Sequence, residues 1–127
     1  MADVTYAQLQ ERVARKLQII ASAESLDAND AAVIIDGLLS VQAQLDRLGI
    51  ATFDVQSGID HPYVEVIAQM GAAELVDDFQ IPEPRRSQLF AAGKVGLPNR
   101  SLAERALRDL IDGTTQKLTV SHDVTVV

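Results

Sequence analysis

The sequence has no cysteine, no tryptophan and only two histidines among its 127 residues. Without cysteine, disulfides, thiolate metal sites and cysteine nucleophiles are excluded. No apolar run approaches the length of a membrane-spanning helix, and polar residues interrupt the first ten positions, where a signal peptide needs an apolar segment. We therefore expect a protein made in the cytoplasm that does not enter a membrane.

Basic residues are scarce, with 11 Lys and Arg against 18 Asp and Glu and a net charge of −7. This balance disfavours general nucleic-acid binding, which needs cations to neutralise phosphates. The charges are also segregated, because residues 17–84 hold one basic and twelve acidic side chains whereas residues 85–117 hold seven basic and three acidic ones. Either these are solvated helix faces, or the basic part of one copy meets the acidic part of another in a head-to-tail contact.

Apolar residues recur at helical spacing along most of the chain and predict four to five helices. The first begins at Thr5, where Gln8 completes a capping box, and the second runs from residues 25–29 to Gly49. A third follows Asp60 and extends to residue 79, with apolar residues on more than one side, as in a central helix. A fourth starts at residues 82–84 and ends by residue 93, and a fifth runs from residue 101 to residue 113.

Two segments alternate between apolar and polar residues, as strands do. The first, residues 50–55, predicts a short strand, and the second, residues 118–126, is rich in β-branched residues. A lone strand needs a partner edge, which is either residues 50–55 of the same chain or a neighbouring protein. The fold class we expect is mostly α: an antiparallel bundle of four to five helices over residues 1–113, a short β element, and an extended strand-like tail over residues 114–127.

No motif in the chain predicts a catalytic, cofactor or metal site. Gly93 to Gly96 contains a lysine but lacks the spacing and the following Ser or Thr of a phosphate loop. Asp27 and its neighbours lack the glycine and distal glutamate of a calcium loop, and His61 and His122 have no metal-ligand spacing. We expect no enzyme, although two buried carboxylates meeting in a cleft would make a small hydrolase the third candidate.

The candidate contact residues fall into two groups. The arginines of the basic region would form one face, and the apolar positions of the tail would form a docking strand. They are Arg85, Arg86, Arg100, Arg105, Arg108, Leu118, Val120, Val124 and Val126.

The order of local sequences resembles a known family. A capped first helix ends in Ala14-Arg15-Lys16-Leu17, and a second helix closes on Leu45-Asp46-Arg47-Leu48-Gly49-Ile50. A proline-started helix then contains Met70-Gly71-Ala72-Ala73 and leads to Ile81-Pro82. Over residues 5–112 this resembles the head-to-tail adaptor proteins of tailed bacteriophages, which include head-completion and packaged-DNA stabilisation proteins.

The resemblance implies a structural virion protein without a cofactor. Its partners would be itself, in a ring of twelve copies at the head-tail junction, the portal protein and the tail proteins. DNA would pass through the ring without specific binding. The alternative is a small helical regulatory module that binds DNA or protein through the five arginines.

Overall fold

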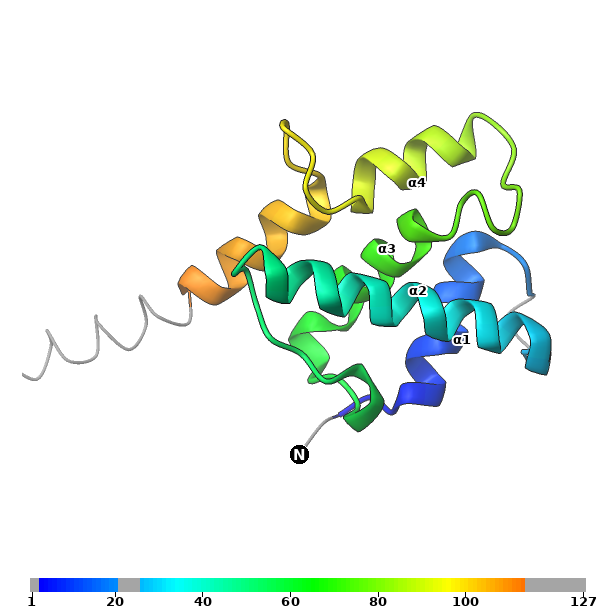
Figure 1. The fold of residues 1–127 in the computed structure, drawn as a ribbon, viewed down its shortest axis with the longest axis horizontal. Coiled ribbons are helices and arrows are strands. Elements are labelled where there is room, and N and C mark those ends of the chain that lie inside the picture. Colours follow the sequence, from blue (N-terminus) through cyan, green and yellow to red (C-terminus); the bar gives the residue numbers. More distant parts are fainter. Residues whose placement is uncertain (1–2, 21–25, 114–127) are drawn as a thin grey trace, which may run out of the picture.

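The computed structural model describes residues 3–20 and 26–113, and this part of the chain is mostly helical (Figure 1). The helices are α1 (Tyr6–Leu17), α2 (Ala28–Arg47), the 3-10 helix η1 (Val55–Ser57), α3 (His61–Glu74) and α4 (Arg85–Gly93). Residues 102–113 form a further helix after α4. The predicted helical fold is thus confirmed.

The starts of α1 and α2 follow from their capping residues. The Thr5 hydroxyl accepts from the Gln8 backbone N–H, and the Gln8 side chain accepts from the Thr5 N–H, which confirms the predicted capping box. At α2 the Asp27 carboxylate accepts from the Asn29 N–H at 2.8 Å. Both caps satisfy backbone donors that have no partner inside the helix.

The start of α3 is held by the N-terminal segment. The Asp60 side chain makes no capping hydrogen bond, and Asp3 Oδ2 instead accepts from the His61 N–H at 3.0 Å. Next to this contact, Val4 and Ile59 form an antiparallel bridge with N–H to O distances of 3.0 and 2.9 Å. Residues 3–4 therefore fix the position at which α3 begins.

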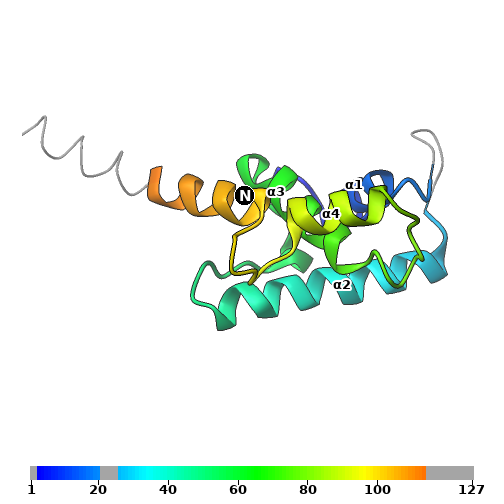
Figure 2. The same ribbon diagram turned by 90° about the horizontal axis from the view of Figure 1, so that it is seen from above.

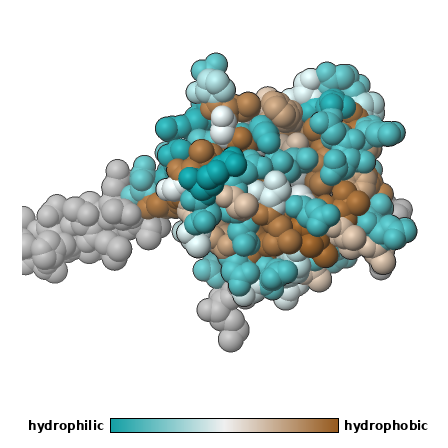
Figure 3. Space-filling model, in the orientation of Figure 1, coloured by the Kyte–Doolittle hydropathy of each residue, from teal (hydrophilic) through white to brown (hydrophobic). Residues whose placement is uncertain are grey.

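The core is built around α3, which packs against α1, α2 and α4. Most of its residues are buried, including Val64, Ile67 and Met70, so the predicted central helix is confirmed. Figure 2 shows α2 on one side of the body, with the other helices on the opposite side. In Figure 3, hydrophilic side chains surround smaller hydrophobic areas on the face over α2.

Two helix crossings depend on glycine. A Cβ on Gly37 of α2 would lie 2.7 Å from side-chain carbons of Leu75, the residue that follows α3. A Cβ on Gly93, the last residue of α4, would lie 2.1 Å from the backbone oxygen of Gln69 in α3. The backbones of α3 and α4 approach each other too closely here for any side chain.

The short strand predicted over residues 50–55 is wrong. Residues 51–54 have no regular secondary structure, and Val55 begins η1. The Val55 N–H donates to the Gln42 side chain at 2.9 Å instead of to a neighbouring strand. Ile50 and Val55 are buried and Phe53 packs on the core, so the alternation arises from an irregular segment lying on the helices.

The end of α3 also differs from expectation. α3 ends at Glu74 rather than at residue 79, and turns follow it to Gln80, whose φ is +51°. The fifth helix is present through residue 113, the last residue described before the tail. The tail of residues 114–127, and with it the predicted strand, lies outside the described residues.

Candidate interaction surface

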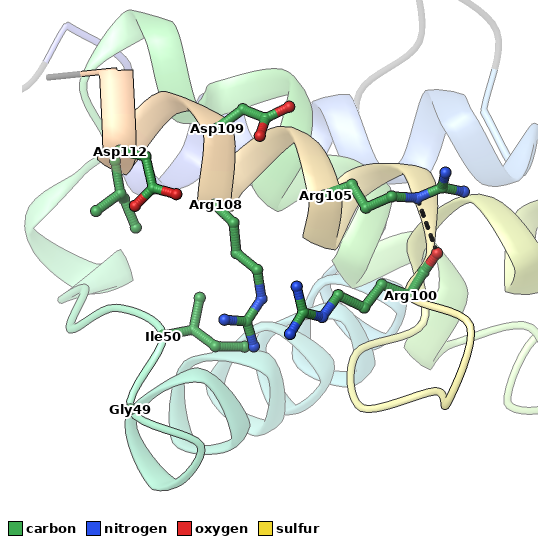
Figure 4. A pocket seen from close by; sticks show the side chains of 8 residues that line it. Gly49, Ile50, Arg100, Arg105, Arg108, Asp109 and Asp112 are labelled. Carbon is green, nitrogen blue, oxygen red and sulfur yellow. Dashed lines mark hydrogen bonds between the residues drawn. The ribbon is translucent and has the colours of Figure 1, made fainter. Parts of the chain in front are cut away.

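A hollow of about 400 Å³ lies between the segment after α2 and the helix of residues 102–113 (Figure 4). Three of the predicted contact residues line it together. Its lining consists of Gly49, Ile50, Arg100, Arg105, Arg108, Asp109, Ile111 and Asp112. The structure thus gathers Arg100, Arg105 and Arg108 into one site.

The helix of residues 102–113 is positioned by its first turn. The Ser101 hydroxyl accepts from the Glu104 N–H at 3.2 Å, which is one half of a capping box. The other half is replaced, because Glu104 Oε1 accepts from the Gly96 N–H at 2.9 Å. Ala103 and Leu107, four positions apart on one face, are fully buried. The helix is thereby tied both to the core and to the loop that precedes it.

Glu104 is the one charged residue buried within residues 3–20 and 26–113, with a side chain that is 3% exposed. Its Oε2 atom lies 3.1 Å from Arg108 Nε and 3.4 Å from Arg100 Nε. Burying a charge is costly unless it is paired and hydrogen-bonded. Two guanidinium groups and one backbone amide supply those partners.

The two guanidinium groups of Arg100 and Arg108 lie side by side and face Ile50 (Figure 4). Arg105 lies apart from them, and its Nε donates to the Arg100 carbonyl at 3.1 Å. The Asp109 carboxylate points away from the guanidinium pair.

The C-terminal end of α2 borders the hollow that Arg100 and Arg108 line. The helix finishes at Arg47, and Gly49 follows with a φ of +70°. Cations are stabilised near a helix C-terminus by the partial negative charge of its free carbonyls. Arg100 and Arg108 line the same hollow as Gly49 and Ile50 and so lie on the favourable side of this helix end.

The other two candidate arginines lie elsewhere and are used within the chain. Arg85 donates through Nη2 to the Lys16 carbonyl, near the end of α1. Arg86 forms an ion pair with Asp77. The five arginines therefore do not form a single face. Leu118, Val120, Val124 and Val126 lie outside the described residues.

A second polar cluster joins α2, α3 and the end of α4. Glu74 Oε2 lies 2.9 Å from Lys94 Nζ, and Glu74 Oε1 accepts from Gln44 Nε2 at 3.0 Å and from Ser40 at 3.3 Å. Lys94 is the lysine of the rejected phosphate-loop motif, and here it is an ion-pair partner. Sequence reasoning missed this cluster and the burial of Glu104, because both depend on contacts between distant segments.

In the part of the chain that the structure describes, no group of three or more His, Cys, Asp and Glu side chains is placed to hold a metal ion. None of the helices searched there is both long and apolar enough to cross a bilayer. Comparisons with protein-family models, with curated proteins and with solved structures found no match to this chain.

Proposed function

We propose that this chain is a structural adaptor subunit of a tailed bacteriophage. It would form a ring at the head-tail junction of the virion, between the portal protein and the tail proteins. The observation that carries the proposal is the helix of residues 102–113, which extends beyond the end of α2 (Figures 1 and 2). An anchored arm of this kind offers surface to a neighbouring subunit.

The anchoring supports a contact role for this arm. Glu104 fixes the first turn of the helix through the Gly96 N–H and two arginines, so the direction of the arm is set before a partner binds. Preorganised elements lose less conformational entropy on association than flexible ones. Arginine is also enriched at protein–protein interfaces, where its planar group binds carboxylates through two hydrogen bonds.

The charge balance is consistent with a DNA channel. A net charge of −7 opposes tight binding to phosphates, and a channel wall must let DNA slide. In this proposal an antiparallel helical bundle repeats as a ring of twelve copies, and DNA passes through it without specific contacts.

The test uses the portal protein encoded in the same genome. Purified portal rings are mixed with this chain, and the mass of the complex is measured by native mass spectrometry. We expect a complex that contains one adaptor copy per portal subunit, and electron microscopy should place the added density at the tail-facing end. A chain that stays monomeric both alone and with the portal contradicts the proposal.

A second candidate, a DNA-binding regulatory module, is favoured by the gathering of Arg100, Arg105 and Arg108 at one hollow. It predicts salt-dependent binding to duplex DNA that weakens when these arginines are replaced by glutamine. Absence of binding at low salt removes this candidate.

A further inference from the structure

The arginine-lined hollow has hydrogen-bond donors to spare. Arg100 and Arg108 both reach the same Glu104 oxygen through Nε, so two guanidinium groups share one carboxylate. Within the described residues their terminal Nη groups have no acceptor, and Figure 4 shows the pair side by side at the hollow. A guanidinium group can bind a second oxyanion through these atoms in a bidentate manner.

The lining favours a single carboxylate over a polyanion. Asp109 and Asp112 also line the hollow, so a chain of phosphates laid across its whole length would meet negative charge, whereas a single carboxylate can bind at Arg100 and Arg108, from which the Asp109 carboxylate points away. Its volume of about 400 Å³ accommodates one acidic side chain, and Ile50 supplies an apolar wall for the methylene group of that side chain. A nucleic-acid backbone would also have to approach a chain with a net charge of −7.

Carboxylates without ionic partners lie in the N-terminal half of α2. Asp30 and Asp36 make no salt bridge within the described residues, whereas Asp27 is engaged in capping the helix. The twenty residues of α2, at about 1.5 Å per residue, make it about 30 Å long. The hollow borders the C-terminal end of α2 at Gly49. Asp36 lies about 16 Å and Asp30 about 25 Å before that end along the helix, so neither aspartate can reach the arginines of its own chain.

We propose that the hollow binds an aspartate from the N-terminal half of α2 of a second copy. Asp36 supplies the carboxylate that accepts hydrogen bonds in the hollow, and Asp30 adds negative charge on the same half of the helix. Because the two surfaces are different, one in the N-terminal half of α2 and the other beyond its C-terminal end, the contact is heterologous and joins copies head to tail. This inference rests on the proposed function and specifies which surfaces meet within the ring.

The test is a charge exchange between two variants. In the first, Arg100→Gln and Arg105→Glu reverse the charge at the hollow, while Arg108 still pairs with Glu104. In the second, Asp30→Asn and Asp36→Lys reverse the charge at the other surface. Self-association is measured by sedimentation velocity at low salt over a range of protein concentrations, and circular dichroism checks that each variant is folded.

We expect each variant alone to associate about tenfold or more weakly than the wild-type chain, because like charges then face each other. An equimolar mixture should recover association. In the mixture the altered hollow of the first variant meets the altered α2 of the second, and the two unaltered surfaces also meet. High salt should reduce the recovery.

Matched controls change the same charges elsewhere. Arg12→Gln with Arg15→Glu alters exposed arginines of α1, and Asp60→Asn with Asp78→Lys alters exposed aspartates outside α2. Neither control should change association.

Three results would overturn the inference: variants that associate like the wild type, a mixture that shows no recovery, or a wild-type chain that does not self-associate at any concentration. Salt-dependent binding of duplex DNA that is lost in Arg100→Gln would assign the hollow to phosphate instead. Assembly of the wild type on the portal is measured separately, so the adaptor proposal can stand when this contact fails. If the wild type forms neither contact, both proposals fall.

Discussion

Glu104 connects three parts of the chain. Its carboxylate accepts from the Gly96 N–H and pairs with the side chains of Arg100 and Arg108. Replacing its carboxylate by the amide in Glu104→Gln leaves two guanidinium groups without their anion. We expect a loss of about 2 to 4 kcal/mol in the free energy of unfolding, measured with urea.

Glu65→Gln is the matched control for this prediction. Glu65 also pairs with two cations, Arg12 and Lys16, but its side chain is 55% exposed. Solvent screens such pairs, so we expect a change below about 1 kcal/mol. Equal effects of the two substitutions would show that burial does not set the strength of the Glu104 contacts.

Tyr6 tests the opposite situation, a buried polar atom that has no partner. Its hydroxyl is buried without a hydrogen bond within the described residues. Burial and the nearby charge of Asp36 both raise the pKa of Tyr6. We expect Tyr6→Phe to leave the free energy of unfolding unchanged or to raise it by up to about 1 kcal/mol, because a desolvated group is removed.

The raised pKa adds a pH dependence with a definite sign. The unfolded chain releases the Tyr6 proton at lower pH than the folded chain does, so this group favours unfolding as the pH rises above its ordinary value near 10. The wild type should therefore lose stability in alkaline solution more steeply than Tyr6→Phe does. Tyr63→Phe, at a residue that packs edge-on against Phe53, serves as the control. Parallel pH profiles for wild type and Tyr6→Phe would contradict the assignment.

At the scale of the elements, the contact between α3 and α4 is the least tolerant of change. In Gly93→Ala a methyl group would lie 2.1 Å from the Gln69 backbone oxygen, and a backbone cannot rotate away as a side chain can. We expect α4 to separate from α3, with a loss of about 3 kcal/mol or more in thermal or urea unfolding.

Gly113→Ala makes the same chemical change where a Cβ would meet nothing within 4 Å. Because alanine favours helix over glycine, this substitution should stabilise the helix by up to about 1 kcal/mol. The two substitutions should therefore change the free energy of unfolding in opposite directions. A mild effect of Gly93→Ala would mean that α4 shifts easily on α3.

The helices were predictable because their signals are local. Each helix is signalled within one short stretch of sequence: Thr5 and Asp27 are capping residues, and the apolar faces of α1 and α2 follow them directly. The strand over residues 50–55 was mispredicted because its apolar residues pack on helices whose position no local pattern gives. The residue that caps α3 was not predicted for the same reason, since Asp3 lies 58 residues from His61 in the sequence.

The candidate site was predicted only in part. The sequence showed a cluster of arginines, and three of them do meet at one hollow. It did not show that Arg85 would turn to the Lys16 carbonyl or that Glu104 would be buried. Which charges remain available to a partner depends on which ones the fold uses internally, and this is decided by tertiary contacts.

At the scale of the whole molecule, the described residues form a core of their own. Its buried members run from Val4 to Leu107, and Ile111 is the last residue packed against them. A chain ending at residue 113 should therefore keep the helical circular dichroism spectrum and the unfolding midpoint of the full chain. Association with the portal should be lost if the tail is a docking strand.

The truncation distinguishes the two possible partners of the tail, residues 50–55 of the same chain and a neighbouring protein. Residues 50–54 hold no strand, and the Val55 N–H is already bonded to Gln42, so residues 50–55 offer no prepared edge for the tail. A neighbouring protein is then the better partner, and adding back a peptide of residues 114–127 should compete with the full chain for the portal. Unfolding of the shortened chain would instead assign the tail to the fold of its own molecule.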